Sequence, residues 1–252
     1  MRISIVTVSF NSAATIADTL RSVAGQTGVA VEHIVVDGGS TDGTKAVIAR
    51  EGAHLARWIS EPDRGIYDAM NKGIGLATGD VVGFLNSDDF YPSSDVLSQV
   101  AATFADPAVD ACHGDLCYVR REDPTAIVRY WRSSPHVPGS FTRGWVPPHP
   151  TFFVRRECYQ RLGGFDLAYR IAADFELMAR FLEVGHLRSV YIPRVLVTMR
   201  LGGTTNRSLR NVVAQNREIW RAMQSHRMTP SLAGFVFGKL ASRGRQFFVR
   251  PA

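Results

Sequence analysis

The chain has 252 residues, 45% of them hydrophobic, and a net charge of +6. This length suits one large α/β domain with an appendage, and the apolar content is sufficient for an extensive core. No run of about 18 apolar residues occurs, which excludes a bilayer-spanning helix, and three cysteines without a CxxC spacing favour neither disulfides nor a zinc site. A strand pattern follows Met1 directly, without a secretory leader, so we expect a cytoplasmic protein.

Strands and helices alternate through the first 90 residues. Apolar, β-branched runs predict strands at residues 3–11, 31–36, 55–60 and 80–85, and amphipathic patterns predict helices at 16–23, 43–51 and 66–77. Each strand ends in polar or acidic side chains. This alternation is typical of an α/β fold with a Rossmann-like, mostly parallel, nucleotide-binding sheet and helices on both faces.

The pattern changes after Pro107. We predict a helix at 94–106, antiparallel strands at 111–119 and 126–131, and a proline-rich loop at 133–150 that is long enough to be an active-site lid. Then follow a strand at 151–154, helices at 156–162 and 171–184, strands at 190–192 and 195–199, and helices at 204–226 and 231–249. The last two helices form a C-terminal helical extension.

The stretch Asn86-Ser87-Asp88-Asp89 ends a strand that reads as buried and parallel. Adjacent carboxylates repel each other unless a cation neutralises them, and a hard divalent ion with oxygen ligands suits them. The alternative is a strand-to-turn junction in which an aspartate caps the next helix. The sequence lacks both GxGxxG after the first strand and GxxxxGK[ST], which argues against a dehydrogenase-type fold and a phosphate-loop nucleotidase.

Six segments in order resemble the inverting family-2 glycosyltransferases, which have the GT-A fold. They are residues 7–11, 36–44, 60–73, 77–80, 84–89 and 173–177, and the resemblance covers roughly residues 1–200. The segment GIYDAMNKG at 65–73 is most similar to the colanic-acid and exopolysaccharide subgroup. The resemblance implies transfer of a sugar from a nucleotide-diphosphate sugar to a saccharide or lipid-linked acceptor during cell-surface polysaccharide or glycolipid synthesis.

The resemblance divides the chain into a glycosyltransferase domain at 1–203, with a nucleotide-binding half at 1–92 and an acceptor-binding half at 93–203, and the extension at 204–252. It implies that the nucleotide is bound by Val8, Ser9, Asn11, Asp37, Arg64, Asp68, Asn71, Lys72 and Asp88. Asp37 matches the carboxylate that accepts a hydrogen bond from the base. Asn86-Ser87-Asp88 matches the DXD metal motif with Asn in first place, so we expect Asp88 and Asp89 to share Mg²⁺ or Mn²⁺.

Asp174 matches the catalytic base, in an "ED" pair whose first position is Ala173 here. A base is needed to take the acceptor hydroxyl's proton, and a helix N-terminus favours the charged form of this carboxyl. A plain helix cap is the alternative. Candidate acceptor-binding residues are His149 and Trp145, with Trp131 as a second aromatic, and His113 and Asp115 are candidates to approach the metal; each also has an ordinary structural interpretation.

The extension carries the net positive charge of the chain. Residues 204–252 hold nine Lys and Arg and one acid, Glu218, so residues 1–203 carry a net charge of −2. On a helical wheel the cationic residues Lys239, Arg243 and Arg250 lie beside an apolar face of Val236, Phe237, Leu240, Phe247 and Phe248. This pattern suits an anionic membrane surface and peripheral attachment. Packing on the domain, or a homodimer face, is the alternative.

Three other functions are considered. A sugar-nucleotide pyrophosphorylase would carry a glycine-rich signature after the first strand, which Ser9-Phe10-Asn11-Ser12 lacks. A degenerate, non-catalytic binder would have lost Asp88, Asp89 or Asp174, and all three are present. Nucleic-acid binding is not expected, because no established motif surrounds the basic residues.

Overall fold

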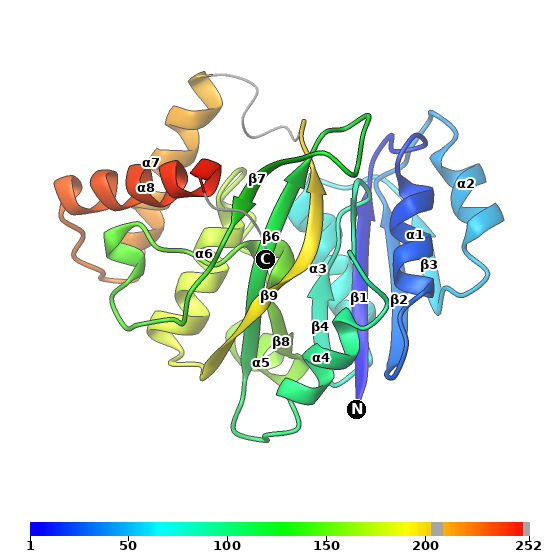
Figure 1. Ribbon diagram of the computed structural model, residues 1–252, viewed down its shortest axis with the longest axis horizontal. Helices are drawn as coiled ribbons and strands as arrows, with labels where there is room; N and C mark the ends of the chain where they lie inside the picture. The colour runs from blue at the N-terminus through cyan, green and yellow to red at the C-terminus, as the bar shows by residue number, and fades with distance from the viewer. Residues whose placement is uncertain (203–208, 249–252) are drawn as a thin grey trace.

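The computed structural model describes residues 1–202 and 209–248 (Figure 1). Arg250, the start of the helix predicted at 204–226 and the side chain of Phe248 lie outside the described parts. The strands are β1 (Arg2–Ser9), β2 (Ala30–Asp37), β3 (Arg57–Ser60), β4 (Val81–Phe84), β5 (Asp89–Phe90), β6 (Ala111–Val119), β7 (Ile127–Trp131), β8 (Phe153–Arg155) and β9 (Ser189–Arg200). The helices are α1 (Ile16–Ala24), α2 (Thr44–Glu51), α3 (Ile66–Leu76), α4 (Val96–Thr103), α5 (Arg156–Leu162), α6 (Ala173–Ala179), α7 (Leu209–Ser225) and α8 (Leu232–Phe248), with short turns η1 (Phe141–Arg143), η2 (His149–Thr151) and η3 (Arg180–Val184).

Within the described residues one mixed sheet runs β3-β2-β1-β4-β8-β6-β9-β5, and β7 pairs with β6. Strands β1 to β4 are parallel to one another, whereas β8 runs antiparallel to both of its neighbours. The carboxyl ends of β1 to β4 therefore meet at one edge of the sheet, which is where open α/β sheets bind ligands.

Helices cover both faces of this sheet, as predicted. Alternate β1 residues point to opposite sides: Val6 and Val8 belong to the core cluster with α3, α5 and α6, whereas Ile3 and Ile5 belong to the cluster with α4. Strand alternation in the sequence therefore predicts which side chains reach each helical layer.

Two strand predictions differ from the structure. Residues 189–200 form one strand rather than two, because the chain continues through a bulge at Pro193 and Arg194, where the register with β6 shifts between Gly114 and Asp115. Pro193 lacks an amide to donate and is tolerated at such a bulge. Strand β5 was not predicted, and it pairs Asp89 with Met199. A two-residue strand has no sequence period, yet this one ties the acidic stretch to β9.

The C-terminal helices pack on the sheet domain, beside α6 and β7 (Figure 1). Ile219, Ala222 and Met223 of α7 join the core cluster of α6, and a Cβ on Gly238 of α8 would overlap the carbonyl oxygen of Arg143. The packing alternative from the sequence is therefore what the structure has. No described helix combines the length and apolar composition that a membrane span requires.

Candidate active site

A cavity of about 510 Å³ opens where the sheet edge meets the C-terminal helices. Residues of α3, the loop after β4, η2, α6, α7 and α8 line it. Among them are Tyr67, Asn86, His149, Asp174 and Lys239. Three positions singled out from the sequence, Asn86, His149 and Asp174, are therefore brought together from distant parts of the chain. The extension supplies part of the wall.

Asp174 lies in the first turn of α6. Its Oδ1 accepts a hydrogen bond from the amide of Phe175 at 2.8 Å and lies 3.2 Å from the hydroxyl of Tyr67, which is also 2.9 Å from the carbonyl oxygen of Ile171. Burial, and then the charge of Asp174, raise the pKa of Tyr67 well above its ordinary value, so the phenol keeps its proton to donate.

The backbone segment that leads into α6 is held by a residue of α7. Glu218 of α7 accepts hydrogen bonds from the amides of Arg170 at 3.0 Å, Ile171 at 2.8 Å and Ala172 at 2.9 Å. These amides precede the first turn of α6, where Asp174 itself accepts from the Phe175 amide, so the role of Asp174 as a base stays a prediction beside the capping alternative. Glu218 was not predicted to belong to the site, although it stands out in the sequence as the single acid of the basic extension.

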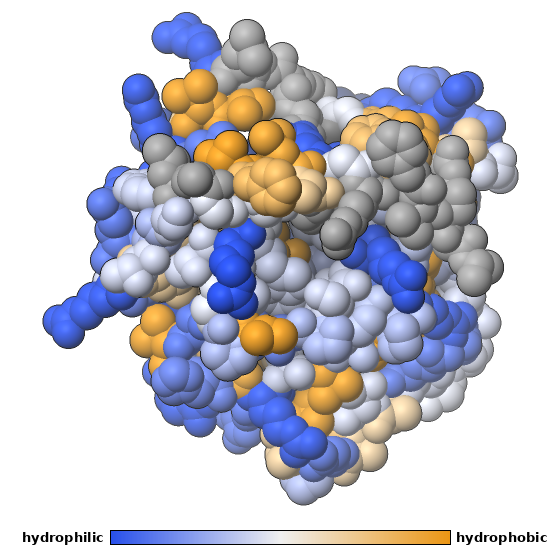
Figure 2. Space-filling view, turned by 60° about the vertical axis from the view of Figure 1, so that its left-hand side comes forward, coloured by the Kyte–Doolittle hydropathy of each residue, from blue (hydrophilic) through white to orange (hydrophobic). Residues whose placement is uncertain are grey.

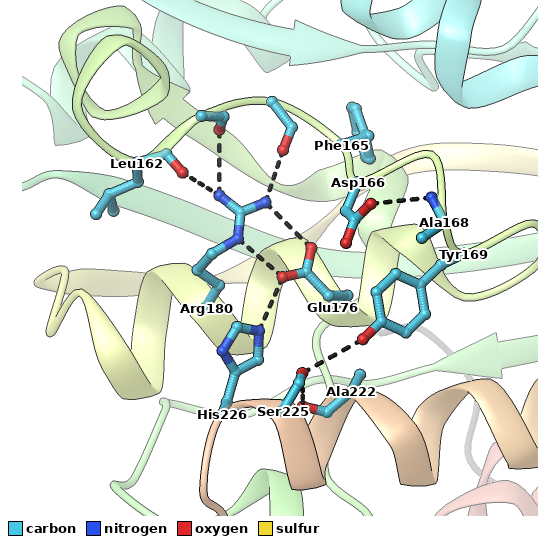
Figure 3. Close-up of polar contacts among 12 residues, drawn as sticks. Leu162, Phe165, Asp166, Ala168, Tyr169, Glu176, Arg180, Ala222, Ser225 and His226 are labelled. Atoms are coloured by element: carbon cyan, nitrogen blue, oxygen red, sulfur yellow. Dashed lines mark hydrogen bonds and ion pairs between the residues drawn. The ribbon is translucent and has the colours of Figure 1, made fainter.

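A second polar cluster joins α6 to α7 (Figure 3). His226 Nε2 lies 2.8 Å from Glu176 Oε1, and Arg180 donates to Glu176 at 2.8 Å and to the carbonyl oxygens of Leu162 and Gly164. Burial alone would raise the pKa of Glu176, but the His226 and Arg180 hydrogen bonds lower it below its ordinary value. The extension therefore holds α6 at two points.

The half-buried Asp88 and the completely buried Asp89 form an acidic pair next to Asn86. Burial raises the pKa of Asp88, and burial together with the charge of Asp88 raises the pKa of Asp89 well above its ordinary value. The oxygens Asn86 Oδ1 and Asp89 Oδ1 are buried without a hydrogen-bond partner. Orphaned oxygens beside two carboxyl groups are the donor set that a hard divalent cation takes.

Among the described residues, no group of three His, Cys, Asp or Glu side chains is placed to hold a metal ion. An ion at this place would therefore need ligands from an amide, water or substrate phosphates, which is how Mg²⁺ is usually bound. The capping alternative fails here, because the residue before α4 is Asp95 rather than Asp88 or Asp89.

Asp37 is completely buried, although base recognition was expected of it. Its carboxylate accepts from Ser9 Oγ at 3.0 Å, Ser60 Oγ at 2.6 Å, the Ser40 amide at 2.9 Å and the Ser40 hydroxyl. Burial would raise the pKa of Asp37, but these hydrogen bonds lower it. Four donors occupy the acceptor positions of the carboxylate, so in this structure it builds the turn, and contact with a base stays a prediction.

Val8 and Asn11 lie at the same sheet edge. Val8 is buried in the core, and Asn11 adopts a left-handed conformation with φ 49°. Its Oδ1 accepts from the amide of Thr41 at 3.0 Å and its own amide donates to Ser40 Oγ at 2.8 Å. These contacts join the loops after β1 and β2, so Asn11, like Asp37, shapes the edge.

The four positions from α3 and its approach have partners within the protein. Arg64 and Asp68 form an ion pair at 2.9 Å, and Lys72 pairs with Glu61 at 2.8 Å. Asn71 donates to the carbonyl oxygen of Phe165 and accepts from its amide, both at 2.8 Å. Asn71 therefore holds the loop before α6, and it is not among the residues that line the cavity.

The two candidate acceptor-binding residues, His149 and Trp145, differ in their relation to the cavity. His149 lines the cavity and stacks on Phe84 with ring centroids 5.7 Å apart, and burial lowers its pKa, so the ring is neutral near pH 7. Trp145 does not line it: the indole donates to Ser134 Oγ at 2.9 Å and packs edge-on against Phe141. Trp131 is the tryptophan that faces the cavity. The reason is packing, because η1 turns the indole of Trp145 into an aromatic cluster.

His113 and Asp115 do not approach the acidic pair. His113 lies 3.1 Å from Ser189 Oγ, and Asp115 accepts from the amide of Ser133 at 2.8 Å and from two tyrosine hydroxyls.

The predicted lid at 133–150 is anchored in this structure, because Phe141 is completely buried and the amide of Gly139 donates to Glu183.

Comparisons with known proteins fit this geometry. An uncharacterized glycosyltransferase of Mycobacterium tuberculosis is 33% identical over 253 residues, covering 98% of this chain and 92% of the relative. A PGL/p-HBAD biosynthesis glycosyltransferase of Mycobacterium bovis is 31% identical over 208 residues, covering 81% of this chain and 78% of the relative.

Two solved structures share the fold. S. aureus TarS superposes with a TM-score of 0.69 at 19% identity, covering 100% of this chain and 46% of TarS, so this chain spans less than half of that protein. The Pyrobaculum calidifontis mannosyltransferase PcManGT gives 0.65 at 23% identity, covering 95% of this chain and 68% of that one. The glycosyl transferase family 2 model matches residues 4–165, and this chain therefore belongs to glycosyl transferase family 2.

Proposed function

We propose that the chain is an inverting hexosyltransferase that moves a sugar from a nucleotide-diphosphate sugar to a saccharide or lipid-linked acceptor, with a divalent metal and Asp174 as the base. The observation that carries this is the position of Asp174 in a cavity that Asn86 of the acidic stretch also lines. Similar folds have been solved with such donors: PcManGT with GDP-Man and Mn²⁺, and TarS with UDP-GlcNAc.

In the proposed reaction Asp174 takes the proton of an acceptor hydroxyl, whose oxygen then bonds to the anomeric carbon. The bond from that carbon to the donor diphosphate breaks, and its electron pair leaves with the diphosphate. Asp174 is the one carboxylate among the described residues that line the cavity. A double displacement would need a second carboxylate as nucleophile, so this lining favours a single, inverting displacement.

The acidic pair fits a metal, and Asp88 and Asp89 with Asn86 would hold it. When bound, Mg²⁺ or Mn²⁺ would neutralise charge on the donor diphosphate. Tyr67 would keep Asp174 oriented by its hydroxyl, and His149, held by stacking on Phe84, lines the same cavity.

The M. bovis relative is named for PGL/p-HBAD biosynthesis, which supports a glycolipid-type or saccharide acceptor for this chain. An exopolysaccharide acceptor, as in the colanic-acid subgroup, is the narrower form of this proposal. Peripheral attachment at the inner membrane face is supported by exposed apolar side chains on α8, where Phe237 is 76% and Leu240 is 65% exposed. Figure 2 shows hydrophobic side chains gathered in the upper part of the face that it presents. A homodimer through the extension stays a prediction.

A thermal-shift screen of UDP, GDP and dTDP, with and without Mn²⁺, tests the donor site. We expect one nucleotide to raise the melting temperature, and Mn²⁺ to increase that shift. The Asp88→Asn variant should lose the metal-dependent part, whereas Asp123→Asn, an exposed surface control, should keep it. A chain that none of these nucleotides stabilises would contradict the proposed function.

A further inference from the structure

One wall of the cavity is cationic and belongs mainly to α8. Lys239 and Arg243, four residues apart on this helix, both line the cavity, and Arg129 of β7 lines it beside them. The guanidinium carbon of Arg129 lies 3.7 Å from the centroid of the Tyr118 ring and 5.9 Å from that of Phe247. Strand β7 and helix α8 therefore present their positive charges to the same space.

Lys239 has a neutral polar partner, and one nitrogen of Arg129 has none. Lys239 Nζ donates to the amide oxygen of Asn216 at 2.7 Å, and Arg129 Nε is buried without a hydrogen-bond partner. Burial and then repulsion from Arg243 lower the pKa of Lys239, whereas Asp174 acts in the opposite direction. Lys239 and Arg129 are both partly buried, and an added anion would stabilise their charges.

The position of Lys239 indicates which substrate brings that anion. Asp174, proposed as the base for the acceptor hydroxyl, is close enough to influence the titration of Lys239. The donor diphosphate has a separate candidate site at Asp88, Asp89 and the metal that they would hold. A cationic wall beside the base therefore lies on the acceptor's side.

We propose that Lys239, Arg243 and Arg129 bind a phosphate group of the acceptor, close to the hydroxyl that receives the sugar. The guanidinium fork suits phosphate oxygens, and the lysine adds a point charge. This inference rests on the proposed function, because it assigns the acceptor's chemical class at the same site. The phosphate belongs either to a soluble phosphate ester or to a lipid headgroup.

Calorimetry on the full chain distinguishes phosphate binding on the acceptor's side of the cavity from binding at the donor site. The protein is first saturated with the nucleoside diphosphate and Mn²⁺ identified by the screen, and then titrated with inorganic phosphate. We expect phosphate to bind with the nucleotide in place, and Lys239→Gln and Arg129→Gln each to weaken phosphate binding about tenfold. Lys239→Arg, which keeps the charge, should retain most of the binding. The exposed control Arg217→Gln on α7 should bind like the wild type.

A second arm distinguishes the source of the phosphate. Flotation with phosphatidylcholine vesicles, with and without phosphatidic acid, is compared between wild type and Lys239→Gln. Retention that needs both phosphatidic acid and Lys239 identifies a lipid headgroup, whereas phosphate binding without such retention identifies a soluble ester. Both outcomes support the proposal.

Three results would overturn it: no phosphate binding beside the nucleotide, equal weakening by Arg217→Gln, or loss of nucleotide affinity in Lys239→Gln as large as the loss of phosphate affinity. The last result would assign the wall to the donor. If no nucleotide binds the wild type, the proposed function fails, but the phosphate titration of the free protein still tests the wall.

Discussion

Glu218 holds the backbone from which Asp174 projects. Its carboxylate accepts three amide hydrogen bonds of 2.8–3.0 Å from residues 170–172, two residues before Asp174. The family match ends at residue 165, and Glu218 lies far beyond it in α7. The C-terminal extension is thus part of the structure that positions the proposed base.

Replacing Glu218 with alanine should lower kcat about tenfold or more, because three amides lose a charged acceptor and α6 loses its fixed start. Nucleoside diphosphate affinity should not change. Glu218→Gln, which keeps one acceptor oxygen, should recover part of kcat, and Glu157→Ala on the exposed side of α5 is the matched control. Steady-state kinetics, with release of nucleoside diphosphate as the readout, measures kcat for each variant. An unchanged kcat in Glu218→Ala would show that the contact does not position the base.

Tyr67→Phe should lower kcat by about 3- to 10-fold, because a hydrogen bond of roughly 1 kcal/mol to Asp174 is lost while the ring packing stays. Steady-state kinetics with release of nucleoside diphosphate as the readout measures this loss. An unchanged kcat in Tyr67→Phe would show that its hydroxyl does not orient the base.

Glu32 predicts an acid-dependent loss of stability. Its buried carboxylate accepts from the amide and hydroxyl of Thr78, and although burial alone would raise its pKa, hydrogen bonds lower it from 4.5 to about 2. A depressed pKa stabilises the fold above pH 4.5, and this contribution, of about 3 kcal/mol, is lost as the pH falls toward 2.

Urea unfolding of the wild type and Glu32→Gln from pH 7 to pH 3 measures this contribution. The difference in unfolding free energy between the two proteins should be largest at pH 7 and shrink below pH 4.5. A difference that is independent of pH would contradict the assignment.

The exposed apolar side of α8 predicts membrane contact. Replacing Phe237 and Leu240 together with serine should reduce flotation with anionic vesicles severalfold, because both side chains are exposed and available to enter the interface. Deleting α8 would not test membrane contact alone, because this helix also lines the cavity. Donor hydrolysis should not change in the double variant. Trp58→Ser, exposed on the distant strand β3, is the control, and equal flotation of all three proteins would exclude this surface.

The sequence predicted the layers of this fold. Apolar, β-branched runs located β1 to β4, and short motifs singled out Asn86 and Asp174, which the fold then brings to one cavity. Contacts that depend on tertiary packing could not be predicted from the sequence. Trp145 could not be told from Trp131 as the cavity aromatic, and the three serines around Asp37 come from three separate segments.

The role of the extension was the largest miss. Charge and a helical wheel describe the outside of α8, where Phe237 is exposed, but they do not tell that Lys239 of the same helix faces the cavity. That depends on Gly238, whose missing Cβ lets α8 lie against Arg143.

The Asp174→Asn variant tests the central claim most directly. Asparagine keeps the shape and removes the base, so release of nucleoside diphosphate from the donor, with water or an added acceptor, should fall at least about 100-fold. Nucleotide binding, measured by thermal shift with Mn²⁺, should stay within about twofold of the wild type. Loss of turnover with retained binding is the result that this account predicts. Full turnover in Asp174→Asn would contradict it.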